Sequence, residues 1–245
     1  MNVKQRLDKL MVERGLAPSR EKAQALIMAG QVVVGEHAAQ KAGQQVAAEV
    51  AIRIKGEQMP FVSRGGLKLA QGLEAFRIDP AGRIAIDVGA STGGFTDCLL
   101  QRGVQQVYAV DVGYGQLAWK LREDPRVVVL EKTNIRHLQP EQLEPLPDLA
   151  VIDASFISLN LVLPPTLALL QRPAEVVALI KPQFEVGKGA VGKGGIVRDP
   201  KLHDEVLATM KQLAKELGVE LLGICDSPIT GADGNREFLM GLRIT

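Results

Sequence analysis

Four charged residues, far apart in the sequence, have the types and predicted placement needed to move a proton. Lys181 and Asp153 each end an apolar run that reads as a strand, and Lys68 and Glu237 are predicted on the same side of the sheet. An amine near carboxylates and a second cation can accept a proton from a substrate. Taken singly, each residue is equally consistent with a surface lysine, a helix cap or a salt bridge.

The segment AIDVGASTGGFTDCLL, residues 85–100, is typical of a strand, a tight turn and a helix. A dinucleotide loop is one alternative, but Ser91 stands where the G-x-G-x-x-G fingerprint requires glycine. The charge of Asp87 would also disfavour a phosphate. S-adenosylmethionine lacks phosphate and carries an ammonium and a sulfonium, so it suits this acid. The remaining alternative is a turn that only packs the helix on the sheet.

Alternating apolar runs and helical patterns predict the elements that position these residues. Strands are expected at 84–88, 105–110, 126–130, 148–153 and 175–180, and helices at 67–76, 94–102, 115–122, 159–170 and 201–217. Two late apolar runs, 219–225 and 237–243, are expected to pair as a hairpin. This order predicts a Rossmann-like, doubly wound α/β sheet of seven strands, mostly parallel with one antiparallel strand.

Polar residues at the carboxyl ends of such strands are expected to meet at one edge of the sheet, where ligands bind. Asp111, after the second strand, could hold the ribose hydroxyls of an adenosine. Asn134, after the third, could pair with an adenine edge. The predicted S-adenosylmethionine contacts are Asp87, Gly89, Ser91, Gly93, Gly94, Phe95, Asp111, Val112, Asn134 and Asp153.

Composition excludes several classes of protein. The chain has 245 residues, 46% hydrophobic and 23% charged, which is typical of a soluble globular protein. It contains no apolar run of about 18 residues, and its first residues are too polar for a signal peptide. We therefore expect a cytoplasmic protein that does not associate with membranes. Its two Cys and three His show no metal-ligand spacing, so no metal site is expected.

The glycine-rich segment GKGAVGKG, residues 187–194, fits the first part of a phosphate-binding P-loop. Gly194 stands where that loop needs Ser or Thr, and GIVRDP follows where a helix should begin. We interpret residues 185–198 instead as a basic loop that closes over RNA, with Lys188, Lys193 and Arg198 near phosphates. A plain flexible loop is the alternative.

The basic residues are concentrated at the N-terminus. Residues 1–60 have nine Lys and Arg against six Asp and Glu, a net charge of +3, whereas residues 61–245 have a net charge of −2. A small basic module beside a larger one suggests that the first holds an anionic polymer and the second processes it. A solvated surface would give the same count.

Within this basic module, helical spacing from Val3 predicts a helix that ends at Gly15, and Ser19 begins a second that ends at Gly30. QVVVG and VAAEVAIRI predict short strands. The motifs R-L-D, S-R-x-x-A and L-I-x-x-G resemble the S-four RNA-binding domain. This resemblance implies RNA contacts on the helical face from Arg6, Lys9, Arg20 and Lys22. A helical hairpin for protein docking is the alternative.

The order of polar strand ends, together with SRGGLKL, resembles the ribose 2′-O-methyltransferases related to FtsJ. With the S-four module in front, the whole chain resembles the TlyA family of ribosomal RNA methyltransferases, also named haemolysins. The segment KGEQMPFVSRGG, residues 55–66, breaks the periodicity and mixes Pro with polar residues, which predicts a linker at about 55–64. The resemblance implies an RNA-binding domain at 1–60 and a methyltransferase domain at 61–245. It also implies ribosomal RNA or a ribosomal subunit as partner, with Arg64 a further RNA contact.

The resemblance also implies roles for the four charged residues. Lys181 would accept the proton of a ribose 2′-hydroxyl, with a cytidine as the expected nucleotide, and Asp153 and Glu237 would orient that lysine. Lys68 would stabilise the developing oxyanion. Two alternatives stay open: an RNA-binding protein without catalysis, and a membrane-lytic protein as the family's other name suggests. No long apolar span or strongly amphipathic basic helix supports the second.

Overall fold

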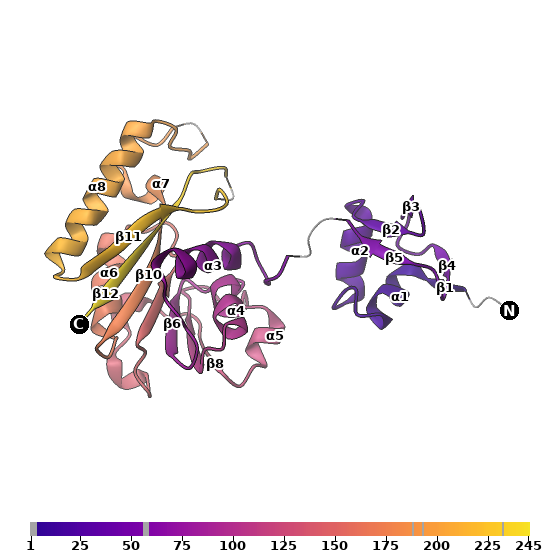
Figure 1. Cartoon of the computed structure of the whole chain (residues 1–245), viewed down its shortest axis with the longest axis horizontal. Helices are drawn as coiled ribbons and strands as arrows, with labels where there is room; N and C mark the ends of the chain where they lie inside the picture. The colour runs from indigo at the N-terminus through magenta and orange to yellow at the C-terminus, as the bar shows by residue number, and fades with distance from the viewer. Residues whose placement is uncertain (1–3, 56–58, 188, 193, 232) are drawn as a thin grey trace. The chain divides into compact units, whose positions relative to one another are not determined.

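The structure, a computed structural model, describes residues 4–55, 59–187, 189–192, 194–231 and 233–245. Its chain divides into two compact units, Met1–Met59 and Pro60–Thr245 (Figure 1). Buried apolar side chains form one cluster in the first unit and two in the second. Each unit therefore has a hydrophobic core of its own.

The first unit combines two helices with five short strands. Its elements are β1 (Lys4–Arg6), α1 (Leu7–Glu13), α2 (Arg20–Met28), β2 (Val32–Val34), β3 (His37–Ala38), β4 (Gln45–Ala47) and β5 (Ile52–Ile54). Strand β1 pairs with β4, and the order β3-β2-β5 forms a second small sheet. The predicted helix cap is confirmed, because the Ser19 hydroxyl accepts a hydrogen bond from the backbone N–H of Lys22 at 3.3 Å.

Two predictions for this unit are wrong. The first helix begins at Leu7, because Lys4–Arg6 pairs with β4 as a strand. The predicted strand VAAEVAIRI is two strands, since the backbone turns after Ala47 and the N–H of Val50 bonds back to the carbonyl of Ala47. In both places, pairing with a distant strand outweighs the local periodicity.

The second unit contains a seven-stranded sheet. Its strands are β6 (Ile84–Val88), β7 (Gln106–Val110), β8 (Val127–Leu130), β9 (Leu149–Ile152), β10 (Ala174–Ile180), β11 (Glu220–Asp226) and β12 (Phe238–Ile244). The order is β11-β12-β10-β9-β6-β7-β8, with β12 antiparallel to both of its neighbours. The predicted mostly parallel sheet and its final hairpin are confirmed.

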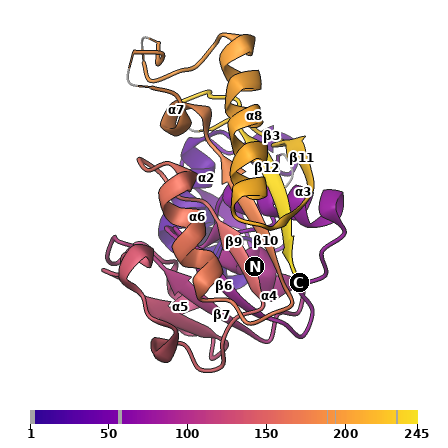
Figure 2. The ribbon, with the colours of Figure 1, turned by 90° about the vertical axis from the view of Figure 1, so that its left-hand side faces the viewer.

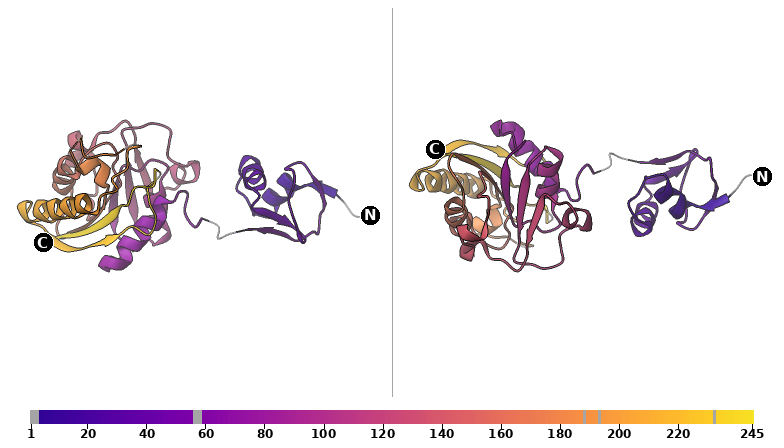
Figure 3. Two further views of the ribbon diagram at one scale, coloured as in Figure 1. Left: turned by 90° about the horizontal axis from the view of Figure 1, so that it is seen from above. Right: turned by 90° about the horizontal axis from the view of Figure 1, so that it is seen from below.

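Helices cover both faces of this sheet. Helices α3 (Gly65–Phe76), α4 (Gly94–Gln101) and the short α5 (Trp119–Arg122) lie on one face. Helices α6 (Leu159–Ala168) and α8 (Pro200–Glu216) lie on the other (Figure 2, Figure 3). Short helical turns η1 (Ile135–His137), η2 (Pro140–Gln142) and α7 (Pro182–Glu185) complete the unit. The carboxyl ends of the parallel strands thus open at one edge between two helical layers.

The helix predicted at 115–122 is wrong for its first half. Only Trp119–Arg122 is helical. Gly115 has a φ of 72°, and its N–H bonds to the carboxylate of Glu131 at 2.8 Å. A left-handed residue whose amide is held by a side chain cannot belong to a helix, so the segment before Trp119 is a loop.

Candidate active site

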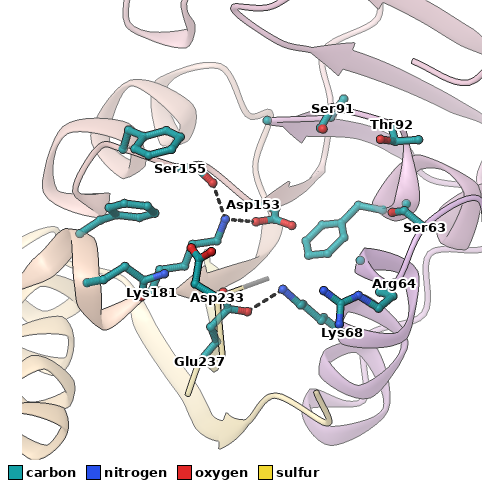
Figure 4. A pocket seen from close by; sticks show the side chains of 18 of the residues that line it. Ser63, Arg64, Lys68, Ser91, Thr92, Asp153, Ser155, Lys181, Asp233 and Glu237 are labelled. Atoms are coloured by element: carbon teal, nitrogen blue, oxygen red, sulfur yellow. Dashed lines mark hydrogen bonds and ion pairs between the residues drawn. The ribbon is translucent and has the colours of Figure 1, made fainter. Parts of the chain in front are cut away.

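A cavity of about 530 Å³ opens at the carboxyl ends of β6, β9 and β10, beside the start of α3 (Figure 4). This volume is within the range of small-molecule sites. All four charged residues singled out in the sequence line it, although they come from four different elements of the chain: Lys68, Asp153, Lys181 and Glu237.

Lys181 follows β10 directly and is held by two residues that follow β9. Its Nζ lies 2.5 Å from Oδ1 of Asp153 and donates a hydrogen bond of 2.7 Å to Oγ of Ser155. The contact with Asp153 is a close ion pair that lacks the alignment of a directed hydrogen bond. Strands β9 and β10 are parallel neighbours, so their ends bring these three side chains together.

Lys68 and Glu237 form the second pair. Lys68 lies on α3 and Glu237 just before β12, and α3 packs beside β12. The Lys68 Nζ donates a 2.6 Å hydrogen bond to Oε2 of Glu237, and both residues are buried. Figure 4 shows the two lysine amines reaching toward the cavity from opposite sides. With one carboxylate for each lysine, the buried cluster is nearly neutral, as burial of charge requires.

The glycine-rich loop after β6 forms another wall. Gly89 has a φ of 86°, and a Cβ there would lie only 2.6 Å from the carbonyl oxygen of Asp153. Gly93, the N-cap of α4, has a φ of 97°. The loop therefore requires glycine at both positions, first for the close approach to the end of β9 and then for the turn into the helix.

Asp111 fastens this loop to the turn after β7. Its two carboxylate oxygens each accept a backbone hydrogen bond of 2.7 Å, one from the N–H of Ser91 and one from the N–H of Gly113. Val112 is 72% exposed beside it. The Asn134 side chain instead caps η1, accepting from the N–H of Arg136 at 3.1 Å.

The structure thus divides the predicted cofactor contacts into two sets. One set lines the cavity: Gly89, Ser91, Gly94, Phe95 and Asp153. The other set lies outside its lining: Asp87, Gly93, Asp111, Val112 and Asn134.

Asp87 lies underneath the loop. Its side chain is fully buried, and Oδ2 accepts a 2.6 Å hydrogen bond from the hydroxyl of Thr96 on α4. The pKa of Asp87 is raised to about 7, chiefly by burial; the Thr96 hydrogen bond lowers it, and the charges of Asp153 and Asp111 add to the increase. Asp87 therefore has no exposed surface with which to contact a ligand directly.

This carboxyl gives a pH-dependent stability. Below the ordinary pKa of aspartic acid, the Asp87 carboxyl is protonated in both the folded and the unfolded chain. The stabilisation of the folded state by the neutral carboxyl is then fully present. Between about pH 4 and 7 the unfolded chain releases the proton first, and the contribution is lost. We expect Asp87→Asn, which keeps an acceptor for Thr96, to gain stability over the wild type by at most about 4 kcal/mol across this range.

Urea unfolding followed by fluorescence of Trp119, the single tryptophan, measures this difference in the second unit. Asp204→Asn, at an exposed position on α8, is the control. Parallel pH curves for the wild type and Asp87→Asn would mean that folding does not shift the pKa of Asp87.

The predicted RNA contacts differ in their placement. Arg64 lines the cavity, and Arg198 is exposed just before α8. Lys9, Arg20 and Lys22 are exposed on the helices of the first unit, but Arg6 lies on β1, so its predicted place on a helical face is wrong. Lys188 and Lys193 lie outside the described residues.

Sequence reasoning missed part of the cavity lining. Ser155 and Phe156 follow β9 in DASF, and Gln183 and Phe184 follow β10 in KPQF, so the strand-end rule could have found them. Phe156 is 91% exposed with a φ of 63°, and its ring centroid lies 5.1 Å from that of Phe184. Ser63 and Asp233 carried no such signal, because neither follows a strand.

Comparison with known proteins agrees with this architecture. Residues 61–244 match the family model of FtsJ-like methyltransferases, and residues 5–52 match that of the S4 domain, the S-four domain named above. A solved S-adenosylmethionine-dependent methyltransferase from Mesorhizobium loti has a TM-score of 0.51 at 15% identity, covering 73% of this chain and 100% of its own. That likeness shows the fold alone.

Closer relatives cover nearly the whole chain. The 16S/23S rRNA (cytidine-2′-O)-methyltransferase TlyA of Mycobacterium tuberculosis is 50% identical, over 97% of this chain and 89% of the relative. Hemolysin A of Brachyspira hyodysenteriae is 40% identical, over 96% of this chain and 98% of the relative. A solved protein from Streptococcus thermophilus, named as a hemolysin, has a TM-score of 0.77 at 46% identity. The match covers 100% of this chain and 90% of the solved chain. The chain belongs to the TlyA family of FtsJ-like methyltransferases.

Proposed function

We propose that this enzyme transfers the methyl group of S-adenosylmethionine to the 2′-hydroxyl of a cytidine ribose in ribosomal RNA. The observation that carries the proposal is the placement of Lys181, which a hydrogen bond to Ser155 and an ion pair with Asp153 hold at the wall of the cavity, facing a second lysine. The name of the Mycobacterium tuberculosis relative supports the substrate and the methylated atom.

The site fits the proposed cofactor. Gly89, Ser91 and Asp153 line the cavity, with the backbone of Gly89 packed against the carbonyl of Asp153, and Asp111 stands at the end of the next strand. S-adenosylmethionine, when bound there, supplies an electrophilic methyl group. Asp111 would hold its ribose, with Asp87 supporting the loop from below.

Lys181 is the proposed proton acceptor. As a neutral amine it has two N–H bonds and one lone pair. Ser155 accepts one N–H bond, and the carboxylate of Asp153 lies 2.5 Å from Nζ, so these two residues hold the amine at the wall of the cavity. A ribose hydroxyl placed there would give its proton to Nζ as its oxygen bonds to the methyl carbon, and the bond from that carbon to sulfur would break, leaving the demethylated cofactor as a neutral thioether.

Lys68 is proposed to stabilise the negative charge that develops on that oxygen. Glu237 holds it through their 2.6 Å hydrogen bond, so the ammonium is already in place and need not reorganise during the reaction. Glu237 would therefore not orient Lys181 directly, as the resemblance implied, but would act on the site by positioning Lys68.

The two units are proposed to divide the work, with residues 1–60 holding RNA and residues 61–245 carrying the reaction. A ribosomal RNA substrate places the enzyme in the cytoplasm, free or on a ribosomal subunit. As to the membrane-lytic alternative, no helix among the described residues has the length and apolar character to cross a bilayer. The hemolysin name belongs to relatives, and the methyltransferase site favours the RNA enzyme.

Cofactor binding is tested by calorimetry with S-adenosylmethionine, ATP and a nicotinamide dinucleotide. We expect only the first to bind. Asp111→Ala should weaken it by about ten- to a hundredfold, because the cofactor can no longer hydrogen-bond to a charged group. Asp204→Ala, exposed on α8, is the matched control. Selective binding of the dinucleotide would overturn the cofactor assignment.

Ser155 tests how the acceptor lysine is oriented. Ser155→Ala should lower kcat about tenfold, because one of the two groups that hold the amine is removed. Binding of S-adenosylmethionine should stay unchanged, and Ser155→Thr, which keeps a hydroxyl, should recover most of the rate. If the Ala and Thr variants behave alike, the hydroxyl does not orient Lys181.

A further inference from the structure

The first unit contains a carboxylate with no exposed surface. Asp8, in the first turn of α1, is 0% exposed and accepts five hydrogen bonds. Oδ1 accepts from Nε of Arg6 and from the N–H of Lys9, each at 3.0 Å. Oδ2 accepts from Nη2 of Arg6 at 2.9 Å, Nη2 of Arg20 at 3.1 Å and Nε2 of Gln24 at 2.9 Å.

This carboxylate stays ionised. Hydrogen bonding from Arg6 holds the pKa of Asp8 well below its usual range, against the opposing effect of burial, and Gln24 and Arg20 lower it further. A buried charge is costly unless it is paired and hydrogen-bonded, and here every lone-pair direction has a donor.

The two arginines bind Asp8 in different ways, but both donate a hydrogen bond to its Oδ2. Arg6 binds Asp8 side-on through Nε and Nη2, and its guanidinium lies over Gly43, where a Cβ would come within 3.2 Å of Nη1. Arg20 binds through Nη2 alone. Because both Nη2 atoms contact the same Oδ2, the guanidinium groups lie close enough to reach the same phosphate.

Both guanidinium groups remain open to solvent. The side chains of Arg6 and Arg20 are 41% and 47% exposed, while Asp8 between them is covered. Within the described part of the chain, no acceptor is found for Nη1 of Arg6 or for Nε and Nη1 of Arg20. These N–H groups have the fork geometry that matches phosphate oxygens.

We propose that Asp8 is a positioning residue that presents Arg6 and Arg20 as a preformed pair for the RNA phosphate backbone. Long, flexible side chains lose conformational freedom when they bind, and a pair that is already fixed loses less. The proposal rests on the RNA-holding role of residues 1–60 and adds to it an acid that strengthens the binding of a polyanion.

Whether Asp8→Asn raises or lowers the affinity for RNA tests this role. Asp8→Asn raises the net charge by one, so electrostatics alone predicts tighter RNA binding. The substitution also places an amide N–H donor against the guanidinium N–H donors, which cannot bond to it. At least one guanidinium must therefore move away from residue 8. We expect affinity to fall about tenfold, and the slope of log K against log salt to become shallower by about 0.7 for each phosphate that the arginines no longer neutralise.

Binding is measured on the full chain with ribosomal RNA purified from a strain that lacks the gene. Glu13→Gln, at an exposed position at the end of α1, makes the same change in charge and should leave the affinity equal or slightly higher. Gln24→Leu removes one of the two hydrogen bonds from α2 to Asp8 and leaves that of Arg20 in place, so it should lower the melting temperature while RNA affinity is unchanged.

The results separate this inference from the proposed function. If Asp8→Asn binds RNA as tightly as Glu13→Gln, the positioning role is wrong. If Gln24→Leu weakens binding as much as Asp8→Asn, Asp8 acts only through the fold, which also overturns it. The double variant Arg6→Ala, Arg20→Ala tests the RNA-holding role itself: wild-type affinity there would contradict the proposed function of the unit.

Discussion

Lys181→Ala is expected to lower kcat for methyl transfer to ribosomal RNA by about a hundredfold to ten-thousandfold, the range that a positioned proton acceptor contributes. The substitution leaves the glycine-rich loop and Asp111 in place, so affinity for S-adenosylmethionine should be nearly unchanged. The first unit is also untouched, so RNA should still bind. Single-turnover rates, with binding measured separately, give this comparison.

Lys211→Ala, an exposed lysine on α8, is the matched control and should keep the wild-type rate. A second variant, Lys181→Arg, keeps the positive charge beside Asp153 but cannot accept a proton, and should be as inactive as Lys181→Ala. If Lys181→Arg retains substantial activity, the residue acts through its charge, and the proton goes elsewhere.

Removal of residues 1–59 should have the second large effect. The unit Pro60–Thr245 contains both large apolar clusters and the whole cavity, so it should fold and bind S-adenosylmethionine unaided. Methyl transfer to ribosomal RNA should nevertheless fall by at least about a hundredfold, because we expect phosphate contacts of the basic unit to supply much of the RNA affinity.

Far-ultraviolet circular dichroism and cofactor calorimetry establish that the truncated chain is folded before its activity is compared. Charge reversal at Arg20 and Lys22 in the full chain should also weaken RNA binding, and the affinity for S-adenosylmethionine should be unchanged. Full activity of the truncated chain would show that residues 1–59 do not hold the substrate.

The parallel sheet was predictable because its strands are continuous apolar runs separated by helical patterns. Burial on both faces produces such runs, and residues such as Val107, Val151 and Val177 are completely buried. The strand-end rule then located Lys181 and Asp153, because topology alone brings the carboxyl ends of β9 and β10 together. Lys68 and Glu237 do not end parallel strands, so the pattern predicted only their side of the sheet, and their roles came from the family resemblance.

The errors arose where contacts distant in sequence decide the structure. Gln5 lies in a strand because it pairs with Val46, and Gly115 interrupts a helical pattern because Glu131 takes its amide. The same limit hid Ser155, whose role depends on its 2.7 Å contact with Lys181, and the hydrogen bonds that Asp8 accepts from Arg20 and Gln24 on α2. No local pattern encodes such contacts.

Mapping of ribose methylation in ribosomal RNA tests the central claim most directly. RNA from strains with the gene, without it, and with Lys181→Ala in its place is compared by a method that detects 2′-O-methyl groups nucleotide by nucleotide. We predict a cytidine 2′-O-methyl group that is present only in the strain with the unaltered gene, and that appears when purified enzyme and S-adenosylmethionine are added to the unmethylated RNA. Identical methylation in the three strains, or a methyl group on a base instead of a ribose, would contradict the account.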